Sequence, residues 1–349
     1  MPDFSTIVRE LKEYCGEPLT FMEICGTHTA AISENGIADM LSDRIRLVSG
    51  PGCPVCVTVA SYIDRLVELA MEENTCVVTF GDMMRVRGSQ KSLRDITAEG
   101  GRVRMIYSPL EIIAMAEQNP AVQYVLAAVG FETTTPVYAI LMDEIISRGI
   151  NNIRLLTALK TMPAVIERLC KESGEISGFI APGHVSVITG TGIYEPVARK
   201  YSMPFVVAGF EGDELLAAIY ALVKLHNKPV VRNLYKKAVT ECGNTVAAQK
   251  VDCYFDNCDA AWRGFGIIPQ SGRILRKEYM QYDAGSFDLM SDTASDNGCS
   301  CPDVITGRIS PNSCPMYGKV CTPDTPKGAC MVSAEGSCYN YFLNKRGQI

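Results

Sequence analysis

The sequence predicts a mainly parallel α/β fold followed by a cysteine-rich C-terminal unit. Two observations predict this fold class. From about residue 16 to residue 227, short apolar runs alternate with amphipathic segments, as successive strand–helix units do. From residue 291 onward, glycine, proline, serine and cysteine dominate, and apolar residues are too sparse to close a core without a covalent or metal cross-link. The apolar runs fit about eight strand–helix units, so a single TIM-like barrel and two smaller doubly wound sheets both remain open.

The expected elements carry recognisable boundary signals. Asp3 can cap a first helix from Phe4 to about Tyr14. Ser108, with a proline and an acid after it, forms a capping box at the start of another helix, and residues 214–226 fit an amphipathic helix. Strands are expected at the apolar runs 19–24, 45–48, 76–80, 103–107, 124–129, 153–158, 178–181 and 205–208. A boundary is expected near residues 228–229, and the stretch 262–272, which is rich in turn residues, belongs to the C-terminal unit.

Composition restricts the class of partner and the compartment. The 349 residues carry a formal net charge of −6, and no run of Lys or Arg provides an electrostatic footprint for nucleic acid or an anionic membrane. No apolar run approaches the roughly 18 to 20 residues of a spanning helix, and the first residues do not resemble a secretory signal. We therefore expect a cytoplasmic protein. Its 15 cysteines are many for a reducing compartment, where clustered thiols more often bind metal or take part in redox chemistry.

Side chains capable of chemistry follow most of the predicted strands, where open α/β sheets place their sites. Cys25 and His28 follow the first apolar run, and His184 follows a Pro-Gly turn after a later one. Each also has an ordinary structural interpretation, because a cysteine after a strand is often a core residue and a carboxylate there often caps the next helix. The carboxylates in equivalent positions are Asp82, Glu132 and Glu211.

Cys53 and Cys56 form a C-x-x-C pair between a Gly-Pro-Gly turn and a predicted helix over residues 58–73. A helix N-terminus lowers the pKa of a thiol, which suits reversible dithiol–disulfide chemistry. The same spacing can supply half of a metal site, but we favour the redox interpretation. No lysine-bearing phosphate loop is present, so Walker-type nucleotide hydrolysis has no support.

Six cysteines lie in the C-terminal unit between residues 299 and 338. Four thiolates can hold an iron–sulfur cluster or a zinc ion, and the spacing alone chooses neither the metal nor the four ligands among the six cysteines. Disulfides remain the alternative, although metal binding is favoured because the local core is poor. The four candidate ligands, separated by 14, 6 and 16 residues, are Cys299, Cys314, Cys321 and Cys338, and the two cysteines left over are Cys301 and Cys330.

Together these motifs resemble the HypD family of [NiFe]-hydrogenase maturation factors over nearly the whole chain. The resemblance implies two Rossmann-like α/β domains plus a cluster-bearing domain, which we prefer to the barrel. We expect these domains at residues 16–120, 121–227 and 228–349, the last together with residues 1–15. The segments that carry the resemblance are 25–29 (CGTHT), 50–56 (GPGCPVC), 130–134 (GFETT), 182–186 (PGHVS), 314–323 (CPMYGKVCTP) and 331–336 (MVSAEG).

The resemblance also implies the chemistry of individual residues. The four spaced cysteines of the tail, which is the C-terminal unit from residue 291 onward, would hold a [4Fe-4S] cluster. Cys301 and Cys330 would form a redox disulfide beside it. Cys25 and a cysteine of a HypC-type small chaperone would hold an iron that carries two cyanides and one carbon monoxide, with the cyanide groups supplied by a HypE-type partner. Residues lining the iron pocket would be His28, His184, Glu132 and Glu211.

The function expected from this resemblance is that of a scaffold on which the Fe(CN)2CO centre is assembled, with electrons passing through the cluster, the Cys301 and Cys330 pair, and the Cys53 and Cys56 pair. A soft thiolate suits iron with strong-field diatomic ligands. Such a protein is an accessory assembly factor with redox activity. Two alternatives stay open, which are a stand-alone thiol–disulfide oxidoreductase driven by an iron–sulfur cluster and a binding module stabilised by zinc.

Overall fold

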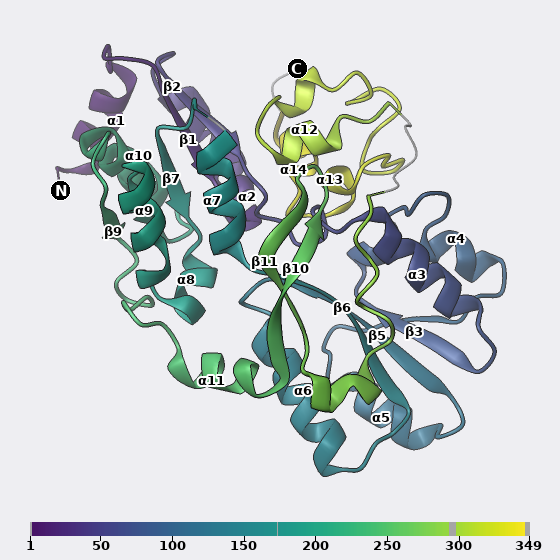
Figure 1. Ribbon diagram of the computed structural model, residues 1–349. Coiled ribbons are helices and arrows are strands. Elements are labelled where there is room, and N and C mark those ends of the chain that lie inside the picture. Colours follow the sequence, from purple (N-terminus) through teal and green to yellow (C-terminus); the bar gives the residue numbers. More distant parts are fainter. Residues whose placement is uncertain (1, 173, 293–297, 346–349) are drawn as a thin grey trace.

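The structure, a computed structural model, describes residues 2–172, 174–292 and 298–345. It contains two separate open sheets, with the cysteine-rich segment packed where they meet (Figure 1). The α/β class with two sheets of mainly parallel strands is therefore confirmed. The barrel alternative is wrong, because the strands divide into two sheets and neither closes on itself.

The first sheet has five parallel strands in the order β2-β1-β7-β8-β9. Helices cover both of its faces, so alternate residues of the central strands enter two different cores. Ile180 and Val206 pack toward α1 and α10, and Phe179 and Phe205 pack toward α7, α8 and α9. The strands are β1 (Leu19–Glu23), β2 (Ile45–Ser49), β7 (Gly178–Ala181), β8 (Phe205–Val207) and β9 (Val231–Asn233), and the helices are α1 (Phe4–Lys12), α2 (Gly26–Glu34), α7 (Met162–Glu172), α8 (Gly183–Thr189), α9 (Glu195–Tyr201) and α10 (Gly212–Leu225).

The second sheet has six strands in the order β10-β11-β6-β5-β3-β4. Four of them are parallel, and the β10–β11 hairpin adds two antiparallel strands at one edge. One face packs on α3 and α4 and the other on α5, α6 and α11. The strands are β3 (Thr75–Thr79), β4 (Val103–Met105), β5 (Gln123–Gly130), β6 (Ile153–Lys160), β10 (Phe255–Trp262) and β11 (Gly266–Leu275), and the helices are α3 (Ala60–Met71), α4 (Leu93–Ala98), α5 (Glu111–Gln118), α6 (Thr135–Ser147) and α11 (Thr245–Tyr254).

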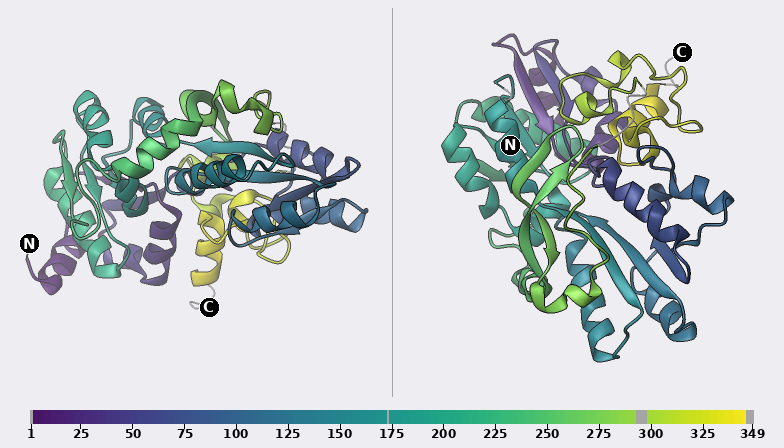
Figure 2. Two further views of the ribbon diagram at one scale, coloured as in Figure 1. Left: turned by 90° about the horizontal axis from the view of Figure 1, so that it is seen from below. Right: turned by 45° about the vertical axis from the view of Figure 1, so that its right-hand side comes forward.

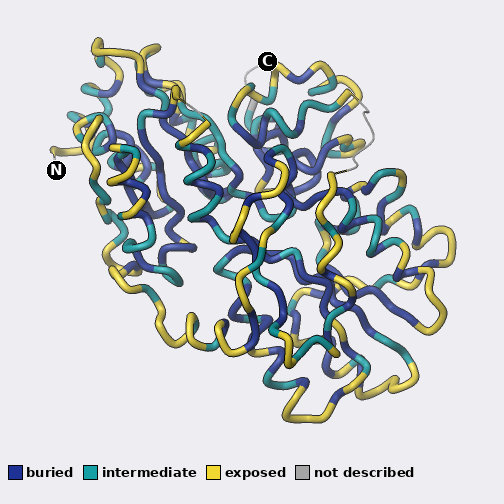
Figure 3. The backbone as a smooth tube through the Cα atoms, viewed as in Figure 1, coloured by how far each residue is buried: buried dark blue, intermediate teal, exposed yellow. Residues whose placement is uncertain are grey.

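The chain passes between the two sheets three times. It leaves the first sheet after β2, returns through α7, and leaves again through helix α11, which is mostly exposed and largely yellow in Figure 3. Residues 16–120 therefore contribute strands to both sheets, and so do residues 121–227. The expected division of the chain into three domains stays a prediction. In the structure, each sheet combines strands from both of these ranges.

Two local expectations differ from the structure. The stretch 262–272 is largely strand β11 of a hairpin, whose turn uses Gly264 and Gly266 at φ +83° and +69°. The sequence did not predict this strand, because glycine and proline are more typical of loops than of strands. The Cys53 and Cys56 motif forms a turn of its own, and α3 begins only at Ala60. The cysteines therefore do not lie in the first turn of that helix.

The C-terminal segment consists of short helices: α12 (Cys301–Ile305), α13 (Ala329–Val332) and α14 (Ser337–Lys345). Its apolar side chains join cores of the sheets, because Val304, Met331 and Phe342 belong to the cluster that also contains Trp262 and Phe179. The segment thus packs against both sheets (Figure 2). In the described part of the chain, no helix combines the length and the apolar character that crossing a membrane requires.

Candidate functional site

Cys25 lies at the point in the first sheet where the strand order reverses. Strand β1 pairs with β2 on one side and with β7 on the other, so the connections after β1 and β7 lead away in opposite directions. Open α/β sheets bind ligands in the crevice that this reversal leaves at the carboxyl ends of the strands. Cys25 follows β1, and His184 follows β7 in the first turn of α8. The sequence placed both residues at strand ends, and the topology makes these strands neighbours.

The Cys25 thiol is held at the N-terminus of α2. Burial is the dominant influence and raises the pKa of Cys25 to about 12, although the backbone N–H groups of His28 and Thr27 favour the thiolate. The sulfur is therefore protonated at neutral pH. A bound metal cation reverses this balance, because a coordinating thiol is deprotonated outright. The position suits a metal ligand better than a free nucleophile.

Glu23 holds the backbone around Cys25. Its Oε2 accepts a hydrogen bond from the Cys25 N–H at 3.0 Å, and its Oε1 accepts one from the Thr29 hydroxyl. The side chain is buried, and burial raises the pKa of Glu23 to about 7. The last residue of β1 and the first turn of α2 are thus tied together through one carboxyl group.

His28 and His184 both contact the ring of Phe210. His28 is completely buried, its Nε2 lies 2.9 Å from the Gly209 carbonyl oxygen, and its Nδ1 has no hydrogen-bond partner in the described residues. Burial lowers the pKa of His28 to about 4, so the ring is neutral. The Phe210 ring lies between the two imidazoles, 4.9 Å from that of His28 and 4.0 Å from that of His184. The two histidines are therefore linked to each other through Phe210.

The loop that carries the C-x-x-C pair packs directly on Cys25. A Cβ added at Gly52 would lie 2.4 Å from the backbone N of Cys25, and the Gly26 N–H donates to the Gly52 carbonyl oxygen at 3.2 Å. Cys53 and Cys56 form a disulfide, and both are buried. The Cys56 N–H donates to Cys53 Sγ at 3.1 Å, which stabilises negative charge on that sulfur without a helix N-terminus.

A small pocket joins this loop to the C-terminal segment. Its walls include Gly26, both cysteines of the disulfide, Cys330 and Glu335. The CGTHT motif, the C-x-x-C pair and one tail cysteine, far apart in sequence, therefore meet at one place.

The three carboxylates predicted at strand ends have different surroundings. One oxygen of Glu132 accepts from the Met162 N–H at 2.7 Å, the other is buried without a partner in the described residues, and burial raises the pKa of Glu132 to about 7. Glu211 is exposed and forms a capping box at the start of α10. Asp82 accepts from the Ser333 hydroxyl at 2.9 Å, which ties the second sheet to the tail. Glu211 thus has a structural explanation, and Glu132 does not.

Two of the tail cysteines lie against one glycine. A Cβ at Gly328 would lie 2.7 Å from Cys299 Sγ and 3.3 Å from Cys301 Sγ. Cys330 Sγ lies 3.1 Å from Cys338 Sγ, and Cys330 also hydrogen-bonds with Cys301, which raises the pKa of the Cys301 thiol. Cys301 and Cys330 are both buried thiols here rather than a disulfide. The redox disulfide expected between them stays a prediction.

Backbone N–H groups point at two of the four spaced cysteines. The Lys327 N–H donates to Cys321 Sγ at 3.3 Å. Burial opposes ionisation of Cys314, but N–H groups that include those of Ser300 and Met316 lower its pKa overall. In the described residues, no three His, Cys, Asp or Glu side chains converge tightly enough to hold a single metal ion.

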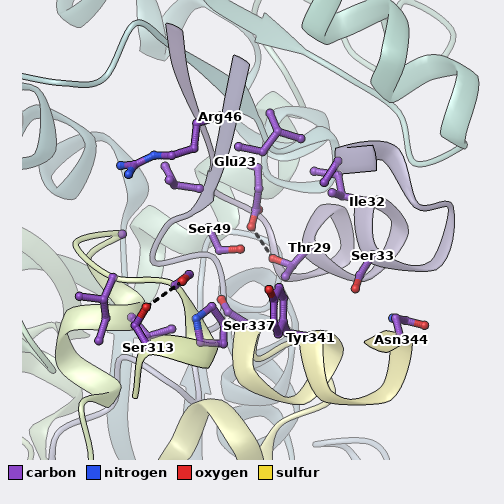
Figure 4. A pocket seen from close by; sticks show the side chains of 18 of the residues that line it. Glu23, Thr29, Ile32, Ser33, Arg46, Ser49, Ser313, Ser337, Tyr341 and Asn344 are labelled. Carbon is purple, nitrogen blue, oxygen red and sulfur yellow. Dashed lines mark hydrogen bonds between the residues drawn. The ribbon is translucent and has the colours of Figure 1, made fainter. Parts of the chain in front are cut away.

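A larger cavity of about 450 Å³ lies on the other side of Glu23 and Thr29. It is bounded by α2 and β2 on one side and by α14 and the segment around Ser313 on the other (Figure 4). Its rim includes the exposed residues Asp39, Arg46 and Arg308, so the cavity opens to solvent. Thr29 and Ser337 line both this outer cavity and the small pocket beside the disulfide.

Sequence reasoning missed four residues of this region. Glu23 had a usable signal, since it is an acid at the end of an otherwise buried strand. Phe210 and Ser337 had none, because their importance depends on neighbours distant in sequence. Tyr194 is buried, its hydroxyl lies 3.1 Å from the Ser186 Oγ, and the charges of Glu132 and Cys25 add to the burial that raises its pKa.

Comparison with known proteins agrees with these motifs. The family model for HypD, described as the hydrogenase formation hypA family, matches residues 3–345. The chain is 40% identical over 339 residues to hydrogenase maturation factor HypD1 of Bradyrhizobium diazoefficiens, covering 93% of this chain and 89% of the relative. It is 40% identical over 347 residues to HypD of Rhizobium leguminosarum, covering 94% and 90%, and 38% identical over 336 residues to HypD of Escherichia coli, covering 93% and 89%. The chain therefore belongs to the HypD family of hydrogenase maturation factors.

Proposed function

We propose that this protein, together with a HypC-type small chaperone, is the cytoplasmic scaffold on which an Fe(CN)2CO centre is assembled for a [NiFe]-hydrogenase. The observation that carries the proposal is the small pocket where Gly26 of the Cys25 loop, the Cys53–Cys56 disulfide and Cys330 meet. An assembly site needs an iron ligand and electron carriers close together. The candidate electron carriers border this pocket, and Cys25, the candidate ligand, directly precedes Gly26 in its wall.

In this proposal, Cys25 is the protein's ligand to the iron that is being assembled, and a cysteine of the chaperone is the other. The iron is cargo, and a HypE-type partner delivers its cyanide groups. Glu23 fixes the backbone of Cys25, and His28, in the first turn of the same helix, is a neutral ring. The neutral His28 ring and the buried Cys25 thiol carry no positive charge. A bound metal cation would therefore be the group that ionises the thiol.

The donor set of the tail fits a [4Fe-4S] cluster. Four thiols at Cys299, Cys314, Cys321 and Cys338 lie in one segment, and the N–H groups directed at Cys321 and Cys314 would stabilise bound thiolates. Each of the four thiolates binds a different iron atom of such a cluster, so the four sulfurs need not converge as tightly as the ligands of a single ion. When bound, the cluster would supply single electrons.

The cysteines outside that set would pass electrons onward. Cys330 hydrogen-bonds with Cys301 and borders the pocket of the Cys53–Cys56 disulfide. A reduced tail pair could therefore exchange with that disulfide, with one disulfide forming as the other is reduced to two thiols. Glu132 has a buried oxygen without a partner in the described residues and is the strongest remaining candidate for proton transfer near the site.

The test is metal analysis and infrared spectroscopy of the complex purified anaerobically with its chaperone. The proposal predicts about four irons per chain for the cluster plus additional iron, accompanied by cyanide and carbonyl stretching bands. Iron at about four per chain without diatomic bands supports a second candidate, a stand-alone thiol–disulfide oxidoreductase, which the Cys53–Cys56 disulfide favours. Zinc without iron would contradict both.

A further inference from the structure

The Cys53–Cys56 disulfide has very little direct access to solvent. Cys53 is 5% exposed and Cys56 is 3% exposed, and the pocket beside them has a volume of about 10 Å³, close to the least that a single water molecule needs. Thiol–disulfide exchange requires an attacking sulfur to reach the disulfide in line with the S–S bond. An external reductant therefore needs a passage to the pair.

The outer cavity has the size and the opening of such a passage. Its volume of about 450 Å³ falls within the range of small-molecule sites, and its rim is exposed at Arg46 and Arg308. Its inner end is formed by Glu23, Thr29 and Ser337. In Figure 4, Thr29 on α2 lies close to Ser337 and Tyr341 on α14.

Two small side chains lie between the cavity and the disulfide pocket. Thr29 and Ser337 line both spaces, so these two hydroxyl-bearing residues are part of the partition. The Thr29 hydroxyl is bound to the carboxyl group of Glu23. Ser337 begins α14 and packs across from α2. A rotation of either side chain, or a small displacement of α14, would join the two spaces.

We propose that the outer cavity admits a small aliphatic thiol, which passes between Thr29 and Ser337 to reduce the Cys53–Cys56 disulfide. This inference rests on the proposed function insofar as the pair is a working redox pair. It adds a second source of electrons that bypasses the tail cysteines.

The chemistry balances with a dithiol as the reductant. One thiolate of the dithiol attacks Cys56 Sγ, the S–S bond breaks, and Cys53 leaves as a thiolate that takes up a proton. The second sulfur of the reductant then displaces Cys56, which leaves two protein thiols and one oxidised reductant. Cys53 is the better leaving group, because the Cys56 N–H donates to its sulfur at 3.1 Å.

The test measures how fast dithiothreitol reduces this pair in the full-length, oxidised protein. Samples are quenched with an alkylating agent, and the peptide that contains both cysteines is quantified by mass spectrometry. Ser337→Leu fills the partition and should slow the reduction at least about tenfold, because access controls the exchange rate. Thr29→Ser removes one methyl group and keeps the hydroxyl that binds Glu23. The disulfide of this variant should be reduced at the wild-type rate or faster.

The matched control is Asn344→Leu, which lies on the same helix and lines the outer cavity but not the inner pocket. It should differ from wild type by less than about twofold, since the partition is unchanged. Ser337→Val serves if the leucine variant does not fold, and it should give a smaller slowing. Wild-type rates in a folded Ser337 variant, or failure of the pair to form a disulfide under mild oxidation, would overturn the inference. This assay involves no diatomic ligands, so a negative result would overturn this inference without deciding the infrared test of the proposed function.

Discussion

Replacing Gly52 by alanine should force apart the two loops that bring the iron ligand and the disulfide together. A Cβ at this position would lie 2.4, 2.6 and 2.7 Å from the N, Cα and C atoms of Cys25. All three are backbone atoms, so no side-chain rotation can relieve the overlap. The hydrogen bond from the Gly26 N–H to the Gly52 carbonyl oxygen must also lengthen when the loops separate.

The expected loss of stability follows from these two effects. Overpacking in a well-packed region typically costs about 1–3 kcal/mol, and a weakened backbone hydrogen bond adds about 1 kcal/mol. We therefore expect the free energy of unfolding to fall by about 2–4 kcal/mol. The control is Gly81→Ala, because the nearest atom to its added Cβ is Met105 Sδ, at the flexible end of a side chain 3.4 Å away. The control should stay within about 0.5 kcal/mol of wild type.

The assay is urea denaturation of the anaerobic protein followed by circular dichroism, with comparison of midpoints at equal m-values. Loss of the diatomic infrared bands should accompany the loss of stability in Gly52→Ala and not in Gly81→Ala. A Gly52→Ala variant with the wild-type midpoint and intact bands would refute the idea that this close contact holds the site together.

Three further predictions follow from buried groups and from the tail. Burial lowers the pKa of Lys160 to about 7, so the cost of burying its charge is full below pH 7 and fades toward pH 10. Lys160→Met should therefore raise the free energy of unfolding more at pH 6.5 than at pH 9.5, and a pH-independent difference would contradict this. Burial raises the pKa of Glu132, so the cost of burying its negative charge grows as the pH rises from about 4.5 to 7. In thermal melts, the stability of Glu132→Gln relative to wild type should therefore increase from pH 5 to pH 8, by up to about 3 kcal/mol. Removal of iron with a chelator should expose residues 299–345 to proteolysis before either sheet, because this segment has few apolar residues of its own, and simultaneous cleavage of all parts would count against a metal-stabilised tail.

Much of the fold could be predicted because local patterns determine it. The strand expected at residues 19–24 is β1 (Leu19–Glu23), and that expected at 178–181 is β7 (Gly178–Ala181). Asp3 caps α1 as expected. The interleaving of the chain between two sheets could not be predicted, because the partner of a strand is selected by packing between segments far apart in sequence. The β10–β11 hairpin was missed because its glycines and proline resemble a loop.

The candidate site was predicted in part. Cys25 and His184 were singled out because each follows a strand, and the sheet order places those strands side by side. The place of Ser337 between the outer cavity and the disulfide depends on α14 packing against α2, which no local pattern encodes. Glu211 illustrates the opposite case, since its strand-end position is explained by the capping of α10.

The most direct test of the proposed scaffold is infrared spectroscopy of three variants, each purified anaerobically with the chaperone. Cys25→Ser removes the proposed iron ligand, Cys53→Ser removes the disulfide, and Cys242→Ser replaces an exposed cysteine as the control. If Cys25 is the iron ligand, the cyanide and carbonyl bands should disappear in Cys25→Ser, weaken or disappear in Cys53→Ser, and persist in Cys242→Ser. Bands of wild-type intensity in Cys25→Ser would contradict this assignment.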